Sequence, residues 1–184
     1  MGTHTPNYPR RKGRRFQSDG SDSALSTAVA TEEILVFLPG PSARELESGD
    51  ALTYDVVCHV EDQNSTNTCR IQVFLQFGTG TAILIGDAVA DDVADNDSAH
   101  LFGSIAIKTA GDAATGVITG SGNGGWNTAS ATSAPVKIYD ASNVDTLENC
   151  SLVVTSTWSV GHADNDVRCL SARLCHEPTL NAPT

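Results

Sequence analysis

Short runs of alternating apolar and polar residues, separated by turn-rich segments, cover the chain from residue 33 to residue 174. The clearest run has Leu52, Tyr54, Val56, Cys58 and Val60 at every second position. This period of two is that of a β-strand with one buried face, and no segment shows a convincing helical period. We therefore predict eight or nine strands, over residues 34–38, 52–60, 71–77, 82–85, 101–107, 117–119, 135–139, 151–158 and 167–174.

Regularly spaced short strands without helices predict an all-β fold, and eight strands in two sheets is the number found in a jelly roll. We expect an antiparallel β-sandwich, a jelly roll, over residues 31–178. An extended N-terminal arm is predicted over residues 1–30 and a short polar tail over residues 179–184. The runs 52–60 and 71–77, with a polar loop between them, are predicted to pair as an antiparallel hairpin.

The predicted arm carries a charge opposite to that of the rest of the chain. Five of the eleven Lys and Arg residues lie in one six-residue stretch: Arg10, Arg11, Lys12, Arg14 and Arg15. No acidic residue precedes Asp19, so six basic residues remain against 22 acidic ones in the body. We expect the arm to bind a negatively charged partner. Protein is favoured over nucleic acid, because an acidic body would be repelled by nucleic acid, but both alternatives stay open.

The last third of the chain resembles a known family. Residues 145–159 read Asp-Thr-Leu-Glu-Asn-Cys-Ser-Leu-Val-Val-Thr-Ser-Thr-Trp-Ser, and the turn Asp164-Asn165-Asp166 precedes a final strand that ends at Glu177. This pattern resembles the last two strands of jelly-roll domains in structural proteins of tailed phages, where a polar strand ending in Trp-Ser is followed by an Asn-containing turn. The strand 101–107 and the glycine-rich segment after it are loosely similar to the middle of such domains. The five cysteines and the basic arm depart from the family pattern.

The resemblance implies a non-catalytic protein of the virus particle. We expect a decoration or cement protein, a homotrimer on the capsid surface of the virion, made in the host cytoplasm. Its arm would bind the major capsid protein or neighbouring subunits. One alternative is a coat protein of a jelly-roll virus whose basic arm binds the genome. Another is a tail-fibre, spike or carbohydrate-binding adhesin module that uses Trp126 as a surface anchor, although Trp126 could equally pack in the core.

Candidate chemical sites are few. The acidic residues Asp91, Asp92, Asp95 and Asp97 could hold a cation, although the EF-hand spacing is absent and a solvated loop is the alternative. The glycine-dense stretch 120–125 lacks the Lys and Ser/Thr of a phosphate-binding loop and is interpreted as a flexible loop or turn. We recognise no catalytic motif and no metal-ligand spacing, so no enzyme activity, metal or cofactor is expected. We recognise no signal peptide and no apolar run long enough for a bilayer, so no membrane contact is expected.

The cysteines are expected to be mostly buried thiols. Their number is odd and no signal peptide is recognised, which argues against an obligate disulfide framework. Cys58 and Cys69 flank the polar loop of the predicted hairpin and could bond across it.

Overall fold

The computed structural model describes residues 13–18, 26–27, 32–62, 67–93, 97–127, 135–161 and 165–179. These residues form strands, turns and loops. They include no helix, and therefore none long and apolar enough to cross a membrane.

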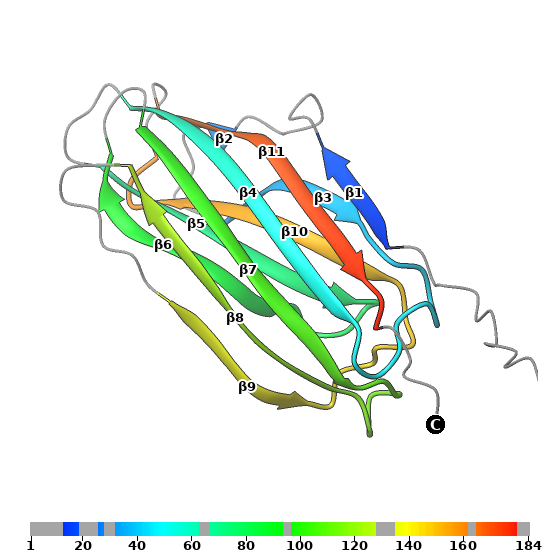
Figure 1. The fold of residues 1–184 in the computed structure, drawn as a ribbon. Helices are drawn as coiled ribbons and strands as arrows, with labels where there is room; N and C mark the ends of the chain where they lie inside the picture. Colours follow the sequence, from blue (N-terminus) through cyan, green and yellow to red (C-terminus); the bar gives the residue numbers. More distant parts are fainter. Residues whose placement is uncertain are drawn as a thin grey trace, which may run out of the picture.

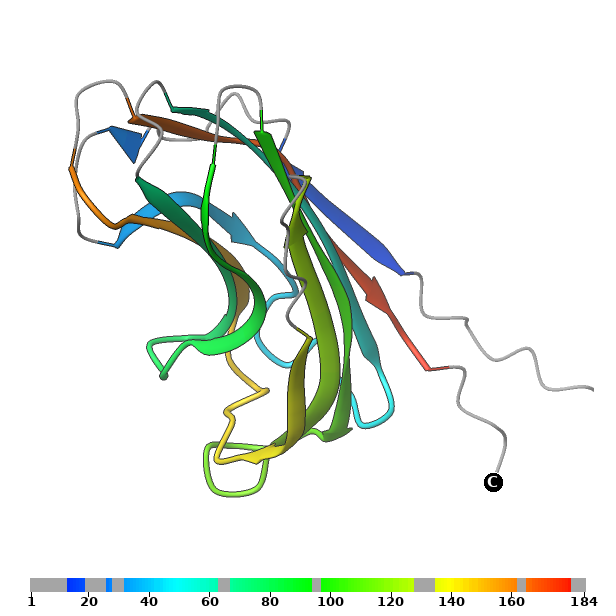
Figure 2. The ribbon, with the colours of Figure 1, turned by 90° about the vertical axis from the view of Figure 1, so that its left-hand side faces the viewer.

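The described residues form eleven strands in two antiparallel sheets that face each other (Figure 1, Figure 2). The larger sheet has the order β1-β11-β4-β7-β8-β9, with the short β2 also paired to β11, and the smaller sheet has the order β3-β10-β5-β6. The strands are β1 (Arg14–Ser18), β2 (Ser26–Thr27), β3 (Glu33–Pro39), β4 (Ala51–Asp62), β5 (Thr68–Phe77), β6 (Ile83–Asp92), β7 (Asp97–Thr109), β8 (Val117–Trp126), β9 (Val136–Ser142), β10 (Cys150–Trp158) and β11 (Asn165–Glu177).

The strand pairing follows the scheme of a jelly roll. Without β2 and the β8–β9 hairpin, eight strands remain, four in each sheet. The first of these pairs with the last (β1 with β11), the second with the seventh (β3 with β10), the third with the sixth (β4 with β7) and the fourth with the fifth (β5 with β6). A long hairpin rolled up into two sheets has this pairing, so the predicted all-β sandwich of jelly-roll type is confirmed.

The core lies between the two sheets. Along β4 the five apolar residues that alternate in the sequence are all buried, as predicted. Alternate residues of β5 are buried in the same way, and they face β4 across the core. Burial of one aliphatic side chain contributes about 1.5–3 kcal/mol, so the inner faces of the strands hold the two sheets together.

The predicted hairpin between residues 52–60 and 71–77 is wrong. β4 pairs with β11 and β7 in the larger sheet, whereas β5 pairs with β10 and β6 in the smaller sheet. Both strands have one apolar face. The same alternation of apolar and polar residues is expected for two neighbouring strands of one sheet and for two strands that pack face to face from opposite sheets. Here the connection passes from one sheet to the other, so the two apolar faces meet in the core.

Part of the segment predicted as an arm belongs to the sandwich. β1 pairs along β11, from Arg14 opposite His176 to Ser18 opposite Ala172. β11 would otherwise present an open sheet edge, which β1 covers. The first strand of the jelly roll thus comes from residues predicted to lie outside it, while residues 1–12, 19–25 and 28–31 lie outside the described residues.

The glycine-dense stretch 120–125, interpreted as a flexible loop, lies in strand β8. Gly122 pairs with Gly103 of β7, and Gly103 pairs with Tyr54 of β4. A methyl group at Gly122 would overlap both the Tyr54 hydroxyl and the Ile85 carbonyl oxygen. The glycines therefore leave space for the Tyr54 ring, whose hydroxyl donates a hydrogen bond to the Ile85 carbonyl in the opposite sheet at 2.5 Å.

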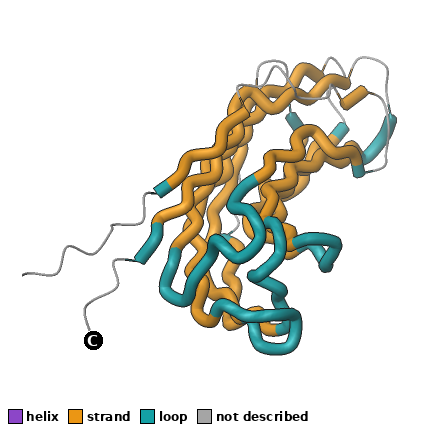
Figure 3. Tube along the Cα trace, turned by 90° about the vertical axis from the view of Figure 1, so that its right-hand side faces the viewer, coloured by secondary structure: helices purple, strands orange, loops and turns teal. Residues whose placement is uncertain are grey.

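One end of the sandwich gathers several connections between strands, drawn as loops in Figure 3. These connections follow β3, β5, β7 and β9 and span residues 40–50, 78–82, 110–116 and 143–149. Because β1 and β11 are antiparallel, the chain also enters β1 and leaves β11 at this end. This is where the structure places its main pocket.

Candidate functional site

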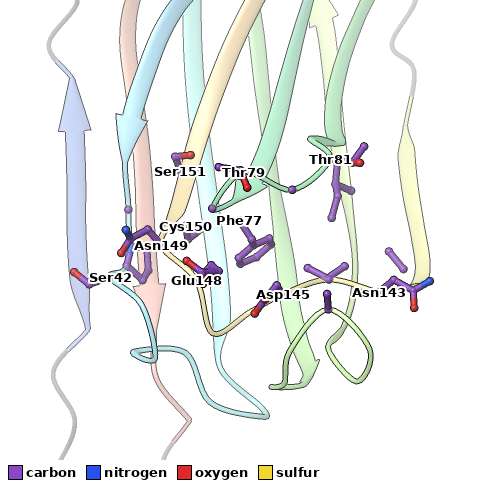
Figure 4. Close-up of a pocket in the computed structure, with 18 of the residues that line it drawn as sticks. Ser42, Phe77, Thr79, Thr81, Asn143, Asp145, Glu148, Asn149, Cys150 and Ser151 are labelled. Carbon is purple, nitrogen blue, oxygen red and sulfur yellow. The ribbon is translucent and has the colours of Figure 1, made fainter.

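An open pocket of about 1180 Å³ lies at this end of the sandwich. Its walls come from the connection after β3, the β5–β6 turn, the β7–β8 connection and the β9–β10 connection (Figure 4). Segments far apart in the sequence thus meet in one site at this end of the sandwich.

Hydrogen bonds tie the walls of this end pocket together. The Cys150 amide donates to the Pro41 carbonyl at 2.9 Å, and the Gly78 amide donates to the Asn149 carbonyl at 2.8 Å. The Asn149 side-chain oxygen accepts a further bond from the Ala43 amide at 2.8 Å. Since each bond joins two segments that are far apart in the sequence, the shape of the pocket is set by the fold before any ligand binds.

The end pocket combines negative charge with apolar surface. Among the described residues that line it, Asp145 and Glu148 are charged and none is basic. Phe37, which is 59% exposed, offers an aromatic ring without cover. Amide and hydroxyl side chains such as Asn143 and Thr79 supply further hydrogen-bonding groups. A ligand with a positive charge and an apolar or aromatic part has the matching chemistry.

The structure places two of the five basic residues of the predicted arm. Arg14 and Arg15 open β1, and both are exposed. Arg14 Nη1 lies 2.8 Å from Glu45 Oε1, in the connection between β3 and β4. The other three, Arg10, Arg11 and Lys12, lie outside the described residues, so their partner stays a prediction.

Of the four predicted cation ligands, the structure describes the side chain of Asp97 alone. Asp91 and Asp92 end β6, Asp97 begins β7, and Asp95 lies outside the described residues. Among the described side chains, no group of three or more His, Cys, Asp or Glu is arranged to hold a metal ion. Because the side chains of Asp91, Asp92 and Asp95 lie outside the described part of the chain, the cation site stays a prediction.

Trp126 lies in the core and not at the surface, so its interpretation as a surface anchor is wrong. It is the last residue of β8 and only 5% exposed. Its indole N–H donates to the Val89 carbonyl of β6 at 2.9 Å. Trp126 falls on the same face of β8 as Ile118, and the alternation of the strand turns this face inward. The adhesin alternative therefore loses the surface residue that was expected to contact its ligand.

A buried acid–histidine pair, which the sequence did not reveal, joins β11 to the connection before β4. His176 Nε2 lies 2.8 Å from Asp50 Oδ2, and both side chains are at most 5% exposed. Asp50 also accepts bonds from the backbone amides of Glu47 and Thr179, each at 2.9 Å. The pair fixes the end of β11 with which the start of β1 pairs. Asp50 and His176 are 126 positions apart, so no local motif links them.

The five cysteines are free thiols in this structure. Cys58 of β4 is the ladder partner of Cys169 of β11, and Cys69 lies in the other sheet. The bond between Cys58 and Cys69, which the sequence left open, is not formed in this structure. The hydrogen bond with Cys169, together with burial, raises the pKa of Cys58. Burial alone raises the pKa of Cys150. These two thiols stay neutral near pH 7 and pack as small apolar groups.

The outer face of the smaller sheet carries an apolar row that crosses all four strands. Phe37 of β3, Val153 of β10, Phe74 of β5 and Leu84 of β6 are successive cross-strand partners. Apolar side chains in such an outer row are typical of a surface that contacts another molecule. Phe37 belongs both to this row and to the end pocket.

No sequence motif could have identified the end pocket. Its carboxylates lie in the segment that resembles phage jelly-roll domains, but nothing in that segment marks Asp145 or Glu148 as site residues. The site exists only because four connections meet at one end of the sandwich. To predict the pocket, the order of the strands in the sheets must be known, and the alternation of apolar and polar residues does not give this order.

Comparison with known proteins adds no family. No family model matches the chain, and no curated protein matches its sequence. Among solved structures, that of infectious bursal disease virus strain Gx has a TM-score of 0.47 at 8% identity, over 94% of this chain and 34% of that chain. Lectin II from Ulex europaeus has a TM-score of 0.47 at 9% identity, over 90% of this chain and 99% of that chain. The seed lectin of Lotus tetragonolobus has a TM-score of 0.40 at 9% identity, over 94% of this chain and 100% of that chain.

This chain thus spans about a third of the length of the virus chain and nearly the whole length of the lectins. We base no argument on these likenesses, because all three TM-scores lie below one half. The assignment to the jelly-roll sandwiches rests on the strand pairing described above.

Proposed function

We propose that the chain is a structural protein of a virus particle, most specifically a phage capsid decoration or cement protein that attaches through its basic N-terminal segment. The observation that supports this most directly is the join between that segment and the sheet. Arg10, Arg11 and Lys12 stand just before β1, whose five residues pair with β11. Because this segment continues directly into β1, a force on the attached segment would act on the hydrogen bonds between β1 and β11.

The charges of the body support the proposal that the basic segment attaches to the capsid while the body projects outward. Three of the described basic side chains are paired with the body's own acids: Arg14 with Glu45, Arg70 with Asp87 and Lys108 with Asp140. The body as a whole is acidic, so it is repelled by phosphate and by acidic protein surfaces. The segment before β1 is then the part that binds such a surface. In a homotrimer, three such segments would raise the overall affinity by effective concentration.

A coat protein whose basic segment binds the genome is the second candidate. The same observation favours it, because the basic residues directly precede the first strand of the jelly roll. This candidate predicts that the purified chain assembles into shells, that nucleic acid co-purifies with it, and that binding of the nucleic acid falls steeply with salt.

The test removes the charges of the segment without shortening the chain, since a deletion of residues 1–30 would also remove β1. The variant carries Arg10→Gln, Arg11→Gln and Lys12→Gln. The matched control carries the same change at three exposed basic residues of the body, Lys108, Lys137 and Arg168. Each protein is mixed with shells of the same virus prepared without the chain, and binding is measured by co-sedimentation and cryo-electron microscopy.

We expect the wild type and the body control to decorate the shells and the arm variant to stay folded but unbound. An arm variant that decorates as well as the wild type contradicts the proposal. Spontaneous assembly of the wild type into shells that contain nucleic acid would favour the coat-protein candidate instead.

A further inference from the structure

Two cysteines lie opposite each other on neighbouring strands of the larger sheet. Cys58 of β4 and Cys169 of β11 are ladder partners, and both side chains are fully buried. Directly opposed residues of an antiparallel pair point to the same face of the sheet, and their Cα atoms lie about 4.5–5.5 Å apart. A disulfide bond needs about 4.4–6.8 Å between the two Cα atoms. The backbone of the two strands therefore already has the spacing of a disulfide-bonded pair.

The two thiols also contact each other through a hydrogen bond. This hydrogen bond lowers the pKa of Cys169 against the opposing effect of burial, and the backbone amide of Ser171 acts in the same direction as the hydrogen bond. Ser171 follows Leu170, at which the register between β11 and β4 shifts. Of the two sulfur atoms, that of Cys169 therefore carries a negative charge more readily. A thiolate is the form of cysteine that attacks a disulfide.

The ladders place residues of other types opposite the remaining cysteines. Cys69 lies opposite Trp158, Cys150 opposite Phe77 and Cys175 opposite Thr53. Cys69 belongs to the smaller sheet, so a bond from Cys69 to Cys58 or Cys169 would have to cross the core. Facing sheets pack about 10 Å apart, which is farther than the Cα atoms of a disulfide span. The geometry thus favours one pair among the five cysteines.

We propose that Cys58 and Cys169 form a disulfide bond when the chain meets a low-molecular-weight disulfide such as oxidised glutathione, and that this bond fastens β11 to β4. The Cys169 thiolate attacks one sulfur of oxidised glutathione, which gives a mixed disulfide and releases one glutathione thiolate. The Cys58 thiol then loses its proton, and its sulfur attacks that of Cys169 and displaces the second glutathione thiolate. Two protein thiols are thereby oxidised to one disulfide, and one oxidised glutathione is reduced to two glutathione molecules, which take up the two protons.

The bond would fasten the last strand of the sandwich at a position where the rest of the sheet depends on it. β11 pairs with β1 on one side and with β4 on the other, so β1 is held to the sheet through β11. Cys58 and Cys169 lie 111 positions apart in the sequence (169 − 58), and a cross-link that closes so long a loop strongly restricts the unfolded chain. Disulfides persist in oxidising surroundings such as virion surfaces. The bond does not depend on the proposed function, although a body displayed on a virus particle would be in such surroundings.

Refolding in a glutathione buffer tests the proposal with the full-length chain. Because both thiols are fully buried, the reduced protein is first unfolded in urea and then refolded with reduced and oxidised glutathione, so that every cysteine can react before the fold closes. The remaining thiols are alkylated in the refolded and then denatured protein. The protein is digested without reduction, and mass spectrometry identifies the linked peptides.

Two variants separate the pair from the other cysteines. The first keeps only the pair and carries Cys69→Ala, Cys150→Ala and Cys175→Ala. The matched control keeps these three and carries Cys58→Ala and Cys169→Ala. Circular dichroism measures the Tm of each refolded protein before and after addition of dithiothreitol. The peptide mapping of the wild type needs no substitution, so it decides the question even where a variant fails to fold.

We expect peptides linked through Cys58 and Cys169 from the wild type and from the variant that keeps only this pair. The bond should raise the Tm of both proteins by about 5–15 °C, and dithiothreitol should reverse this increase. The control should show no such increase. A refolded wild type in which Cys58 is linked to Cys69, or in which the pair stays reduced or carries glutathione, overturns the proposal. A linked protein with a Tm below that of the reduced form overturns it as well, because the native strands would then not accommodate the bond.

Discussion

The side chain of Tyr54 differs from that of phenylalanine only by its hydroxyl, and in the structure this hydroxyl makes a buried hydrogen bond. Tyr54 is 3% exposed, and its hydroxyl donates to the Ile85 carbonyl at 2.5 Å. Ile85 is the extra residue of a bulge, because Val73 pairs with Gly86 and the next residue of β5 already pairs with Leu84. The extra residue of a bulge is left out of the ladder, so the Tyr54 hydroxyl supplies the bond that its carbonyl would otherwise lack.

The substitution Tyr54→Phe keeps the ring and leaves a buried carbonyl without this partner. A buried polar group that loses its partner costs about 1–3 kcal/mol, so we expect the free energy of unfolding near pH 7 to fall by about this amount. For a chain of this length, that corresponds to a decrease of roughly 2–12 °C in Tm.

The same variant changes how stability depends on alkaline pH. Burial raises the pKa of Tyr54 above its ordinary value of 10.0. Above this value the unfolded chain loses the phenol proton while the folded chain keeps it, so the wild type loses stability by about 1.4 kcal/mol per pH unit on account of this group. The Phe variant lacks this contribution. The stability difference between the two proteins should therefore be constant below about pH 10 and shrink above it.

Urea unfolding followed by tryptophan fluorescence measures both effects, since Trp126 and Trp158 are buried. The two proteins are compared at matched pH values under reducing conditions, so that the contributions of the thiols cancel in the difference. Equal stability near pH 7 would refute the role of the hydrogen bond. Two stability curves that stay parallel through the alkaline range would refute the raised pKa of Tyr54.

Three further changes test the packing of the sandwich. Gly122→Ala places a methyl group against the Ile85 backbone carbonyl, and urea unfolding should show a loss of about 3 kcal/mol, with Gly125→Ala on the outer face as a nearly neutral control. Asp50→Ala leaves buried His176 without its acid and should cost about 3–5 kcal/mol in the same assay; unchanged stability would show that the pair contributes nothing. Alkylation of the native protein should modify half-buried Cys175 first, and mass spectrometry that finds a buried cysteine reacting equally fast would contradict the described burial.

Most strands of the body could be predicted because they bury one face, and alternation records that burial directly. β4 and β5 are clear in the sequence for this reason, whereas β10, which is buried on both faces, is recognisable as a continuous apolar and β-branched run. The sequence predicts β8 only as far as residue 119, because glycine has no side chain to show the alternation. Gly122 is required by the bulk of Tyr54 on β4, a contact between strands that are not sequence neighbours, whereas Gly120 and Gly124 face the backbone of β7 and β6.

The arrangement of the strands could not be predicted from the same pattern. Alternation shows that β4 and β5 each have an apolar face. It does not show whether the two strands are neighbours in one sheet or face each other from opposite sheets. The sequence does not reveal β1, because this strand pairs at an edge, is mostly exposed and therefore carries few apolar residues. The end pocket depends on the strand order itself, and the acid–histidine pair depends on residues brought together only by the closed sandwich.

The start of β1, the buried pair and the end pocket lie at one end of the sandwich, and this has a mechanical consequence. A pull on residues before Gly13 acts on β1, whose first residue pairs with His176. His176 is held by Asp50, and Asp50 also holds the backbone of Glu47 and Thr179. The load therefore passes into the same connection, residues 40–50, that forms one wall of the end pocket. If the segment before β1 attaches the chain, the hydrogen bonds of this unit carry the load, and the opposite end of the body is left free of the attachment.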